Sequence, residues 1–97
     1  MDNDREQLLK SLYSLDKKQR KVVKVMGLPE RVQDWTPEVI RSIYDRWEQQ
    51  QQSGFDGAGI IEADAQTAGV SHQIAHTVHD KIATIHMWQE HEASHKT

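Results

Sequence analysis

The stretch AQTAGVSHQIAHTVHDKI, residues 65–82, decides how the second half of the chain folds. Gly69 stands between two segments of helical character, and glycine readily takes the positive φ that a tight turn between helices requires. Ala65 is small enough for two helices to cross closely, Val70 can fill the inside of the corner, and Ser71 can cap the helix that follows. This stretch therefore predicts a helix, a glycine turn and a second helix.

The rest of the chain also shows helical spacing, so we expect an all-α domain of four or five helices. Ser14 or Asp16 can cap the second helix, and Thr36 with Pro37 is typical of a helix start. Three glycines within residues 53–59 predict a loop. The expected helices cover residues 4–14, from the cap to about 26, 37–52, 60–68, and from about 71 to about 90, with a fraying polar tail.

The whole chain, residues 1–97, is expected to form one domain. Its N-terminal helices, residues 1–53, carry the basic segment, and residues 60–81 form the corner, for which helix 37–52 serves as the supporting helix. The apolar stripes predict the buried side chains, and all three tryptophans fall on or beside a stripe. The expected core residues are Leu8, Leu9, Leu12, Val22, Val23, Met26, Val39, Ile40, Ile43, Tyr44, Trp47, Ile74, Ala75, Val78, Ile82 and Ile85, together with Trp35 and Trp88.

Charge is unevenly distributed along the chain. The net charge is −3, and residues 54–97 contain only two Lys or Arg against six Asp or Glu. Most basic residues lie in the first half, and five of them fall within KKQRKVVK, residues 17–24. Such a run is most often a solvated helix face, but it can also contact phosphates.

The run AQTAGVSHQ resembles the helix-turn-helix of lactose-repressor-type regulators and related bacterial and phage regulators, which favour A-x-x-A-G-V-S-x-Q. The resemblance covers residues 60–81 only. Asp64 departs from the pattern, because an apolar residue usually stands there, and Ala75 is smaller than the usual Val or Ile. The resemblance implies a small sequence-selective DNA-binding regulator that binds double-stranded DNA, with the second helix of the motif as the recognition helix.

Carried over by position, the outward side of that helix would contact the DNA, and Gln73 could bridge adenine in the major groove. The residues implied for base or phosphate contacts are Ser71, His72, Gln73, His76 and Thr77. The basic residues that could supply phosphate contacts are Lys17, Lys18, Arg20, Lys21 and Lys24, if the fold brings them beside the motif. Asp80 would face phosphates unfavourably, and no arginine lies on this surface.

Two further expectations concern partners. A single recognition helix makes few base contacts, so a homodimer is expected, with Ile85, Met87 and Trp88 of the last helix as its seam. The alternative function is a non-enzymatic helical protein-interaction module, such as a phage- or plasmid-type adaptor or inhibitor. Such a module would use the corner only as architecture, and its acidic second half would meet a basic partner.

The histidines of the last helix, His72, His76, His79 and His86, form one stripe at the edge of its apolar face. They indicate amphipathic packing first, with a metal site or a pH-sensitive interface as the other interpretations. Residues 91–95, HEASH, match the His-Glu-x-x-His of zinc metalloproteases, but only two residues follow to supply a third ligand. We therefore expect no catalytic residues, no metal and no cofactor.

Composition narrows the remaining classes. The chain has no cysteine, which excludes disulfides, thiolate metal sites and thiol catalysis. No apolar run is long enough for a membrane span, and the acidic N-terminus lacks the order of a secretory signal. A cytoplasmic protein is the resulting expectation.

Overall fold

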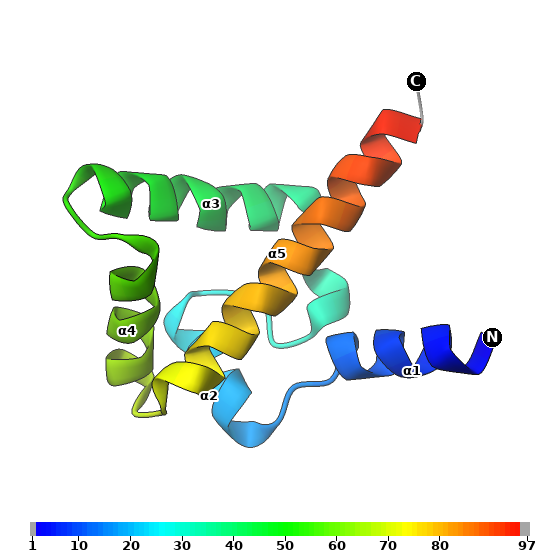
Figure 1. The fold of residues 1–97 in the computed structure, drawn as a ribbon, viewed down its shortest axis with the longest axis horizontal. Helices are drawn as coiled ribbons and strands as arrows, with labels where there is room; N and C mark the ends of the chain where they lie inside the picture. Colours follow the sequence, from blue (N-terminus) through cyan, green and yellow to red (C-terminus); the bar gives the residue numbers. More distant parts are fainter. Residues whose placement is uncertain (1, 96–97) are drawn as a thin grey trace.

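The computed structural model describes residues 2–95, and all of its regular structure in this range is helical (Figure 1). The all-α prediction is confirmed. In chain order the elements are α1 (Asp2–Tyr13), α2 (Lys17–Val25), the 3₁₀ helix η1 (Val32–Asp34), α3 (Pro37–Gln52), α4 (Gly57–Ala68) and α5 (His72–His95).

Short polar side chains cap α2, α3, α4 and α5. Asp16 caps α2, where its Oδ1 accepts from the Gln19 N–H at 2.8 Å and the Gln19 side chain accepts from the Asp16 N–H at 3.2 Å. Thr36 Oγ1 accepts from the Val39 N–H at 3.3 Å at the start of α3. Asp56 does the same for α4 and accepts from the Gly59 N–H at 2.7 Å. That cap starts α4 inside the segment for which the glycines predicted a loop.

The corner between α4 and α5 is closed by backbone hydrogen bonds around Gly69. Gly69 has a φ of 71°, and its N–H donates to Gln66 O at 3.2 Å. The Val70 N–H donates to Ala65 O at 3.0 Å, which completes a Schellman motif. Ser71 Oγ then accepts from the Ile74 N–H at 3.3 Å and caps α5. The predicted helix, glycine turn and second helix are therefore present.

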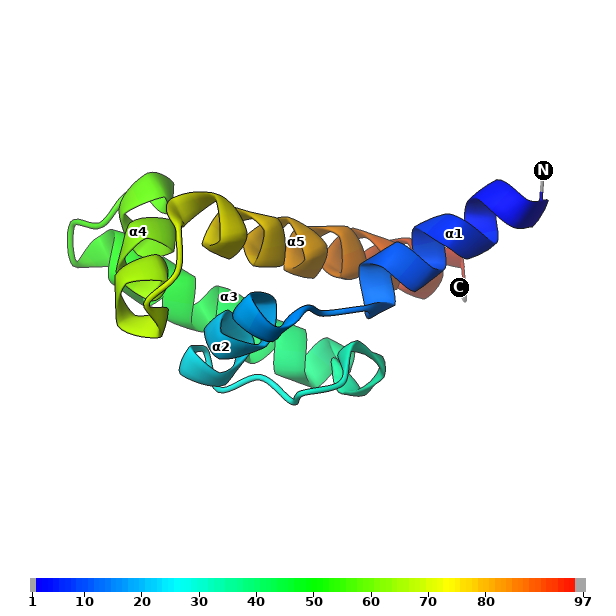
Figure 2. The same cartoon turned by 90° about the horizontal axis from the view of Figure 1, so that it is seen from below.

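Helix α5 is the longest element, and α2, α3 and α4 pack against it (Figure 1). Viewed from below, α5 lies on one side of the molecule, while α2 and α3 lie on the other (Figure 2). Both α2 and α3 contact α4 and α5, but α2 packs against this pair more extensively. The helix over residues 37–52 was expected to support the corner. In the structure α2 makes the larger contact with the two helices of the corner.

One core joins the inner faces of α2, α3, α4 and α5. Three large side chains expected in the core lie outside it: Leu8 is 68% exposed, Trp88 is 42% exposed, and Leu9 is partly buried but does not pack against the core. All three line the space between α1 and the C-terminal part of α5. The buried hydrophobic residues are Val22, Val23, Met26, Leu28, Val32, Trp35, Ile40, Ile43, Ile60, Ala65, Ala75, Val78, Ile82 and Ile85.

The last helix continues further than the sequence indicates. We expected fraying after about residue 90, but α5 runs to His95. Gln89 helps to fix this end, because its Nε2 donates to the backbone oxygen of Trp35 at 2.8 Å. Within residues 2–95 no helix is both long and apolar enough to span a membrane.

Candidate interaction surfaces

The residues implied for DNA contacts at the start of α5 differ in whether their side chains already form hydrogen bonds within the protein. Gln73 and His76 are exposed. The Thr77 hydroxyl instead donates to the backbone oxygen of Gln73 at 2.9 Å, and the Ser71 hydroxyl is used as the helix cap. His72 Nδ1 lies 2.8 Å from a carboxylate oxygen of Glu62 on α4. Three of the five expected contacts are therefore engaged in these bonds, and the exposed His76 lies 3.1 Å from Asp80.

Each histidine of the predicted stripe lies beside a carboxylate. Two pairs cross from α5 to α4, and two lie within α5 at a spacing of four residues. The pairs are His72–Glu62 at 2.8 Å, His76–Asp80 at 3.1 Å, His79–Asp64 at 2.8 Å and His86–Glu90 at 3.7 Å. Across α4 and α5 the sequence has a single Lys or Arg, Lys81. The outward side of α5 is therefore acidic when the imidazoles are neutral.

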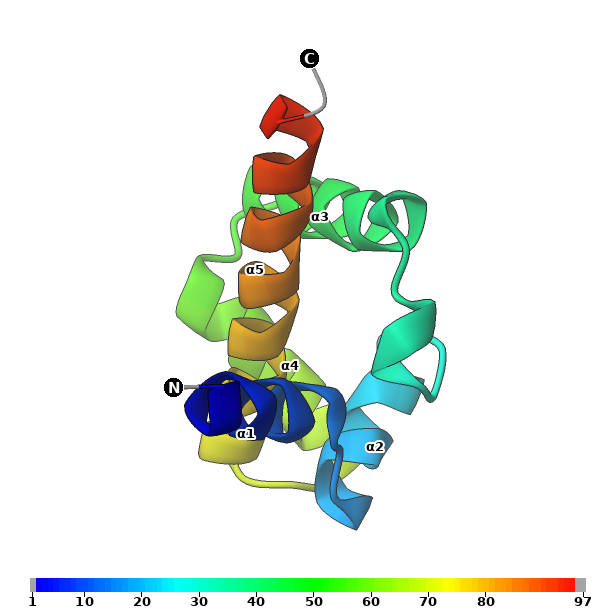
Figure 3. The ribbon, with the colours of Figure 1, turned by 90° about the vertical axis from the view of Figure 1, so that its right-hand side faces the viewer.

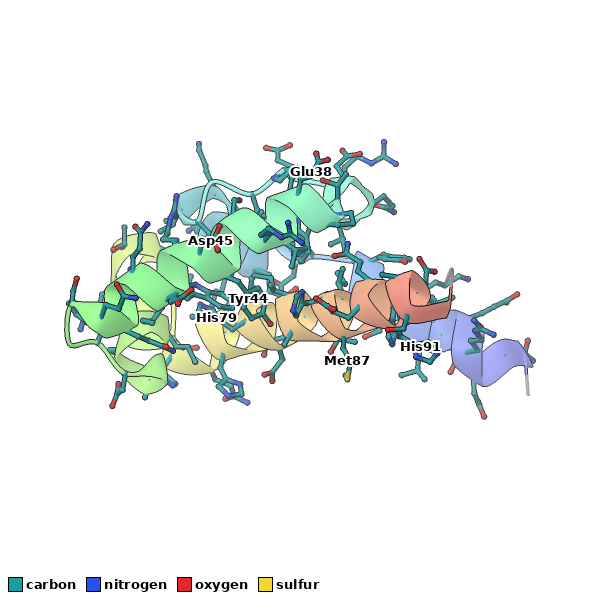
Figure 4. The ribbon with its side chains drawn as sticks, turned by 90° about the horizontal axis from the view of Figure 1, so that it is seen from above. Glu38, Tyr44, Asp45, His79, Met87 and His91 are labelled. Atoms are coloured by element: carbon teal, nitrogen blue, oxygen red, sulfur yellow. The ribbon has the colours of Figure 1, made fainter. Side chains whose placement is uncertain are left out.

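Two of these imidazoles also stack on aromatic side chains of α3. The rings of His79 and Trp47 are 4.6 Å apart and nearly parallel, and those of His86 and Tyr44 are 4.3 Å apart. Figure 4 shows Tyr44 and His79 between α3 and α5. Burial raises the pKa of Tyr44 above its usual value. These contacts fit the amphipathic-packing interpretation of the stripe. Among the residues that the structure describes, no three potential metal ligands of the His, Cys, Asp or Glu type gather at one point.

The basic residues of α2 point away from the recognition-helix candidate. Val22 and Val23 are buried and mark the side of α2 that packs against α4 and α5. At about 100° per residue, the basic positions 17, 20, 21 and 24 fall on the opposite side of the helix, and Lys18 is at its edge; all five side chains are exposed. The end-on view shows α2 lying to one side of α5 (Figure 3). The fold therefore separates the α2 cations from the outward side of α5.

An apolar groove lies between α1 and the C-terminal half of α5. Its volume is about 510 Å³, and its walls are largely carbon. Met87, one residue before Trp88, is 63% exposed and points away from α3 (Figure 4). Ile85 is buried, so the expected dimer seam is reduced to Met87 and Trp88. The groove-lining residues are Arg5, Leu8, Leu9, Tyr13, Trp88, His91 and Glu92.

Lys81 links the C-terminal end of α1 to α5. Its Nζ donates to Ser11 O at 3.0 Å, to Ser14 O at 2.6 Å and to Gln19 Oε1 at 3.4 Å. These bonds satisfy carbonyls at the end of α1, which has few other contacts with the body. Burial lowers the pKa of Lys81, and the nearby Asp16 carboxylate opposes that shift. The sequence gives no sign of this link, because the partners lie more than sixty residues apart.

Comparison of the chain with protein-family models, with curated proteins and with solved structures finds no match.

Proposed function

We propose that this chain is a non-enzymatic protein-interaction module that receives an amphipathic helix of a partner protein in the groove between α1 and α5. The observation that carries the proposal is the exposure of Leu8 and Trp88 on the α1 and α5 walls of this groove. Exposed apolar surface of this kind is typical of protein-binding sites.

The chemistry of the groove indicates the partner helix. Its apolar walls suit Leu, Met or aromatic anchors at a spacing of three and four residues. Glu92 lines the groove on α5 and Arg5 lines it on α1, and the second half of the chain is acidic. Basic residues flanking the apolar stripe of the partner would complement this charge, mainly by raising the association rate.

Selection from a displayed library of helical peptides tests this proposal. We expect the selected peptides to share an amphipathic apolar stripe with Lys or Arg on its flanks. Their binding should be lost in Leu8→Glu, because a carboxylate then enters the apolar groove, and kept in the matched surface variant Gln73→Ala. Peptides that bind Leu8→Glu as well as the unchanged chain would refute the groove as the docking site.

A second copy of the chain is the competing occupant, since Trp88 of the groove wall also belongs to the expected dimer seam. Sedimentation velocity over a range of concentrations separates the two cases. A dimer that dissociates in Leu8→Glu would assign the groove to self-association and overturn the proposal of a separate partner. A monomer at every concentration agrees with it.

Sequence-selective DNA binding is the second candidate, and the geometry of the corner favours it. The Schellman turn at Gly69 and the Ser71 cap place Gln73 and His76 outward at the start of α5. Asp80 and Glu62 on the same surface oppose phosphate contact. If DNA is read by α5, Gln73→Ala should reduce discrimination between duplexes in gel retardation at low salt. Equal retardation of all duplexes by both proteins would refute recognition through α5.

A further inference from the structure

The exposed side of α2 is a stripe of cations that form no ion pair with the described side chains. Lys17, Lys18, Arg20, Lys21 and Lys24 are all exposed. Among the side chains that the structure describes, the ion pairs all involve histidine, and none involves these five residues. An acidic residue three or four positions away would partly neutralise such a cation, but α2 itself contains none, and the carboxylate of Asp16 is used as the helix cap. We call these five residues the α2 cation stripe.

The helix that carries the stripe is fixed by its N-terminal cap and by its buried side. Asp16 and Gln19 form the reciprocal cap at its start, and Val22 and Val23 are buried against α4 and α5. A helix fixed at its cap and along its buried side holds the backbone positions of these charges at constant spacing, so little backbone entropy is lost when a ligand binds. The backbone of the stripe is therefore preorganised.

The rest of the molecule increases the contrast in charge. Helices α4 and α5 contain one Lys and no Arg, and the Nζ of that Lys81 is bonded to the end of α1 and to Gln19. Because α2 lies on the side of the fold away from the outward side of α5 (Figures 2 and 3), the positive and negative surfaces are separated. A polyanion would be attracted to α2 and repelled from α5, although the net charge is −3.

We propose that the α2 cation stripe binds the phosphate backbone of duplex nucleic acid without reading its sequence. Residues 17–24 span about 10 Å along a helix, which is the axial length of about three successive phosphates of one strand. Lysine and arginine on phosphates fix position and give no base discrimination. Gln19 has the one side-chain amide in α2. Its Oε1 accepts from the Asp16 N–H and from Lys81 Nζ, so this side chain is held away from a base edge.

Fluorescence anisotropy with two labelled duplex DNAs of unrelated sequence, measured over a range of KCl concentrations, tests this proposal. We expect equal affinities for both duplexes and a slope of log K against log salt of about −3 to −4. Lys21→Ala should flatten the slope by about one for both duplexes. Lys21→Arg should restore it. Arg41→Ala, which removes a cation from α3, and Gln73→Ala, which alters α5, should leave the slope unchanged.

Three results would overturn the proposal. Absence of binding at the lowest salt excludes the stripe as a duplex-binding surface. If Lys21→Ala and Arg41→Ala lose the same amount of duplex affinity, the duplex is attracted by the total positive charge of the protein, and α2 contains no specific site. Binding to vesicles containing anionic lipid without binding to duplex assigns the stripe to a membrane surface. Because the stripe and the α1–α5 groove lie on different elements, Leu8→Glu should bind duplex normally, and the two proposals are decided separately.

Discussion

Replacing Lys81 with methionine should release the C-terminal end of α1 from α5. Methionine keeps the apolar stem but removes the ammonium that bonds to Ser11 O, Ser14 O and Gln19 Oε1. A hydrogen bond from a charged donor stabilises by about 1.5–3 kcal/mol, but burial of the ammonium offsets much of this gain. Burial does lower the pKa of Lys81. We therefore expect a net loss of about 1–2 kcal/mol in the docking of α1.

Hydrogen exchange measures this loss locally. A 12-residue helix is marginal in water on its own, so undocked α1 should unfold readily. A loss of about 1.4 kcal/mol raises the exchange rate of α1 amides about tenfold, while amides in α3 and the middle of α5 keep their protection. Lys10→Met, which removes an exposed cation of α1, is the matched control and should change little. Unchanged exchange of α1 in Lys81→Met would refute the role given to this side chain.

Other predictions concern two glycines, Tyr44 and the pH dependence that comes from Lys81. Gly69→Ala should destabilise the fold by about 1 kcal/mol, because its φ of 71° strains any L residue and no heavy atom within 4 Å would add a clash. Gly57→Ala should instead stabilise the fold by about 0.5 kcal/mol, because it restricts the unfolded chain. The urea midpoints of the two variants should therefore move in opposite directions. A shift in the same direction would contradict the explanation from backbone conformation. Because burial raises the pKa of Tyr44, its contribution to stability is complete below about pH 10 and is lost as pH rises through its folded-state pKa. In Tyr44→Phe, the free energy of unfolding measured with urea should therefore fall less steeply as the pH rises. An unchanged dependence on pH would contradict this role of Tyr44. The lowered pKa of Lys81 has the opposite effect, because the unfolded chain then binds the proton more tightly than the folded chain. The free energy of unfolding should therefore increase as the pH rises toward about 10.5, and Lys81→Met should remove this increase.

Features that depend on a few adjacent residues could be predicted from the sequence. The Gly69 turn, the Thr36 cap and the Asp16 cap each need only a side chain or a φ that neighbouring residues define. The apolar spacing also identified the inner faces of α2, α3 and α5. Local chemistry is sufficient for these features because helix ends and turns satisfy their hydrogen bonds within about four residues.

Features that depend on the path of the whole chain could not be predicted. Periodicity places Leu8 on an apolar side of its helix, but it does not say whether another element reaches that side. Trp88 likewise extends an apolar stripe beyond the point where α5 leaves the core. The pairs His72–Glu62 and His79–Asp64 need α4 and α5 to cross at a particular register. The separation of α2 from the outward side of α5 also follows only from the packing, and it decides where the cations lie.

Mapping of backbone amide shifts by NMR tests the central proposal, docking in the α1–α5 groove, most directly. The ligand is an amphipathic helical peptide with basic flanks, taken from the displayed library and titrated into the full chain. We predict that the perturbed amides cluster in α1 and in residues 85–94 of α5, with α2 and residues 71–77 unchanged. A cluster at the α4–α5 corner, centred on Gln73 and His76, would contradict this account and favour an α5 recognition surface.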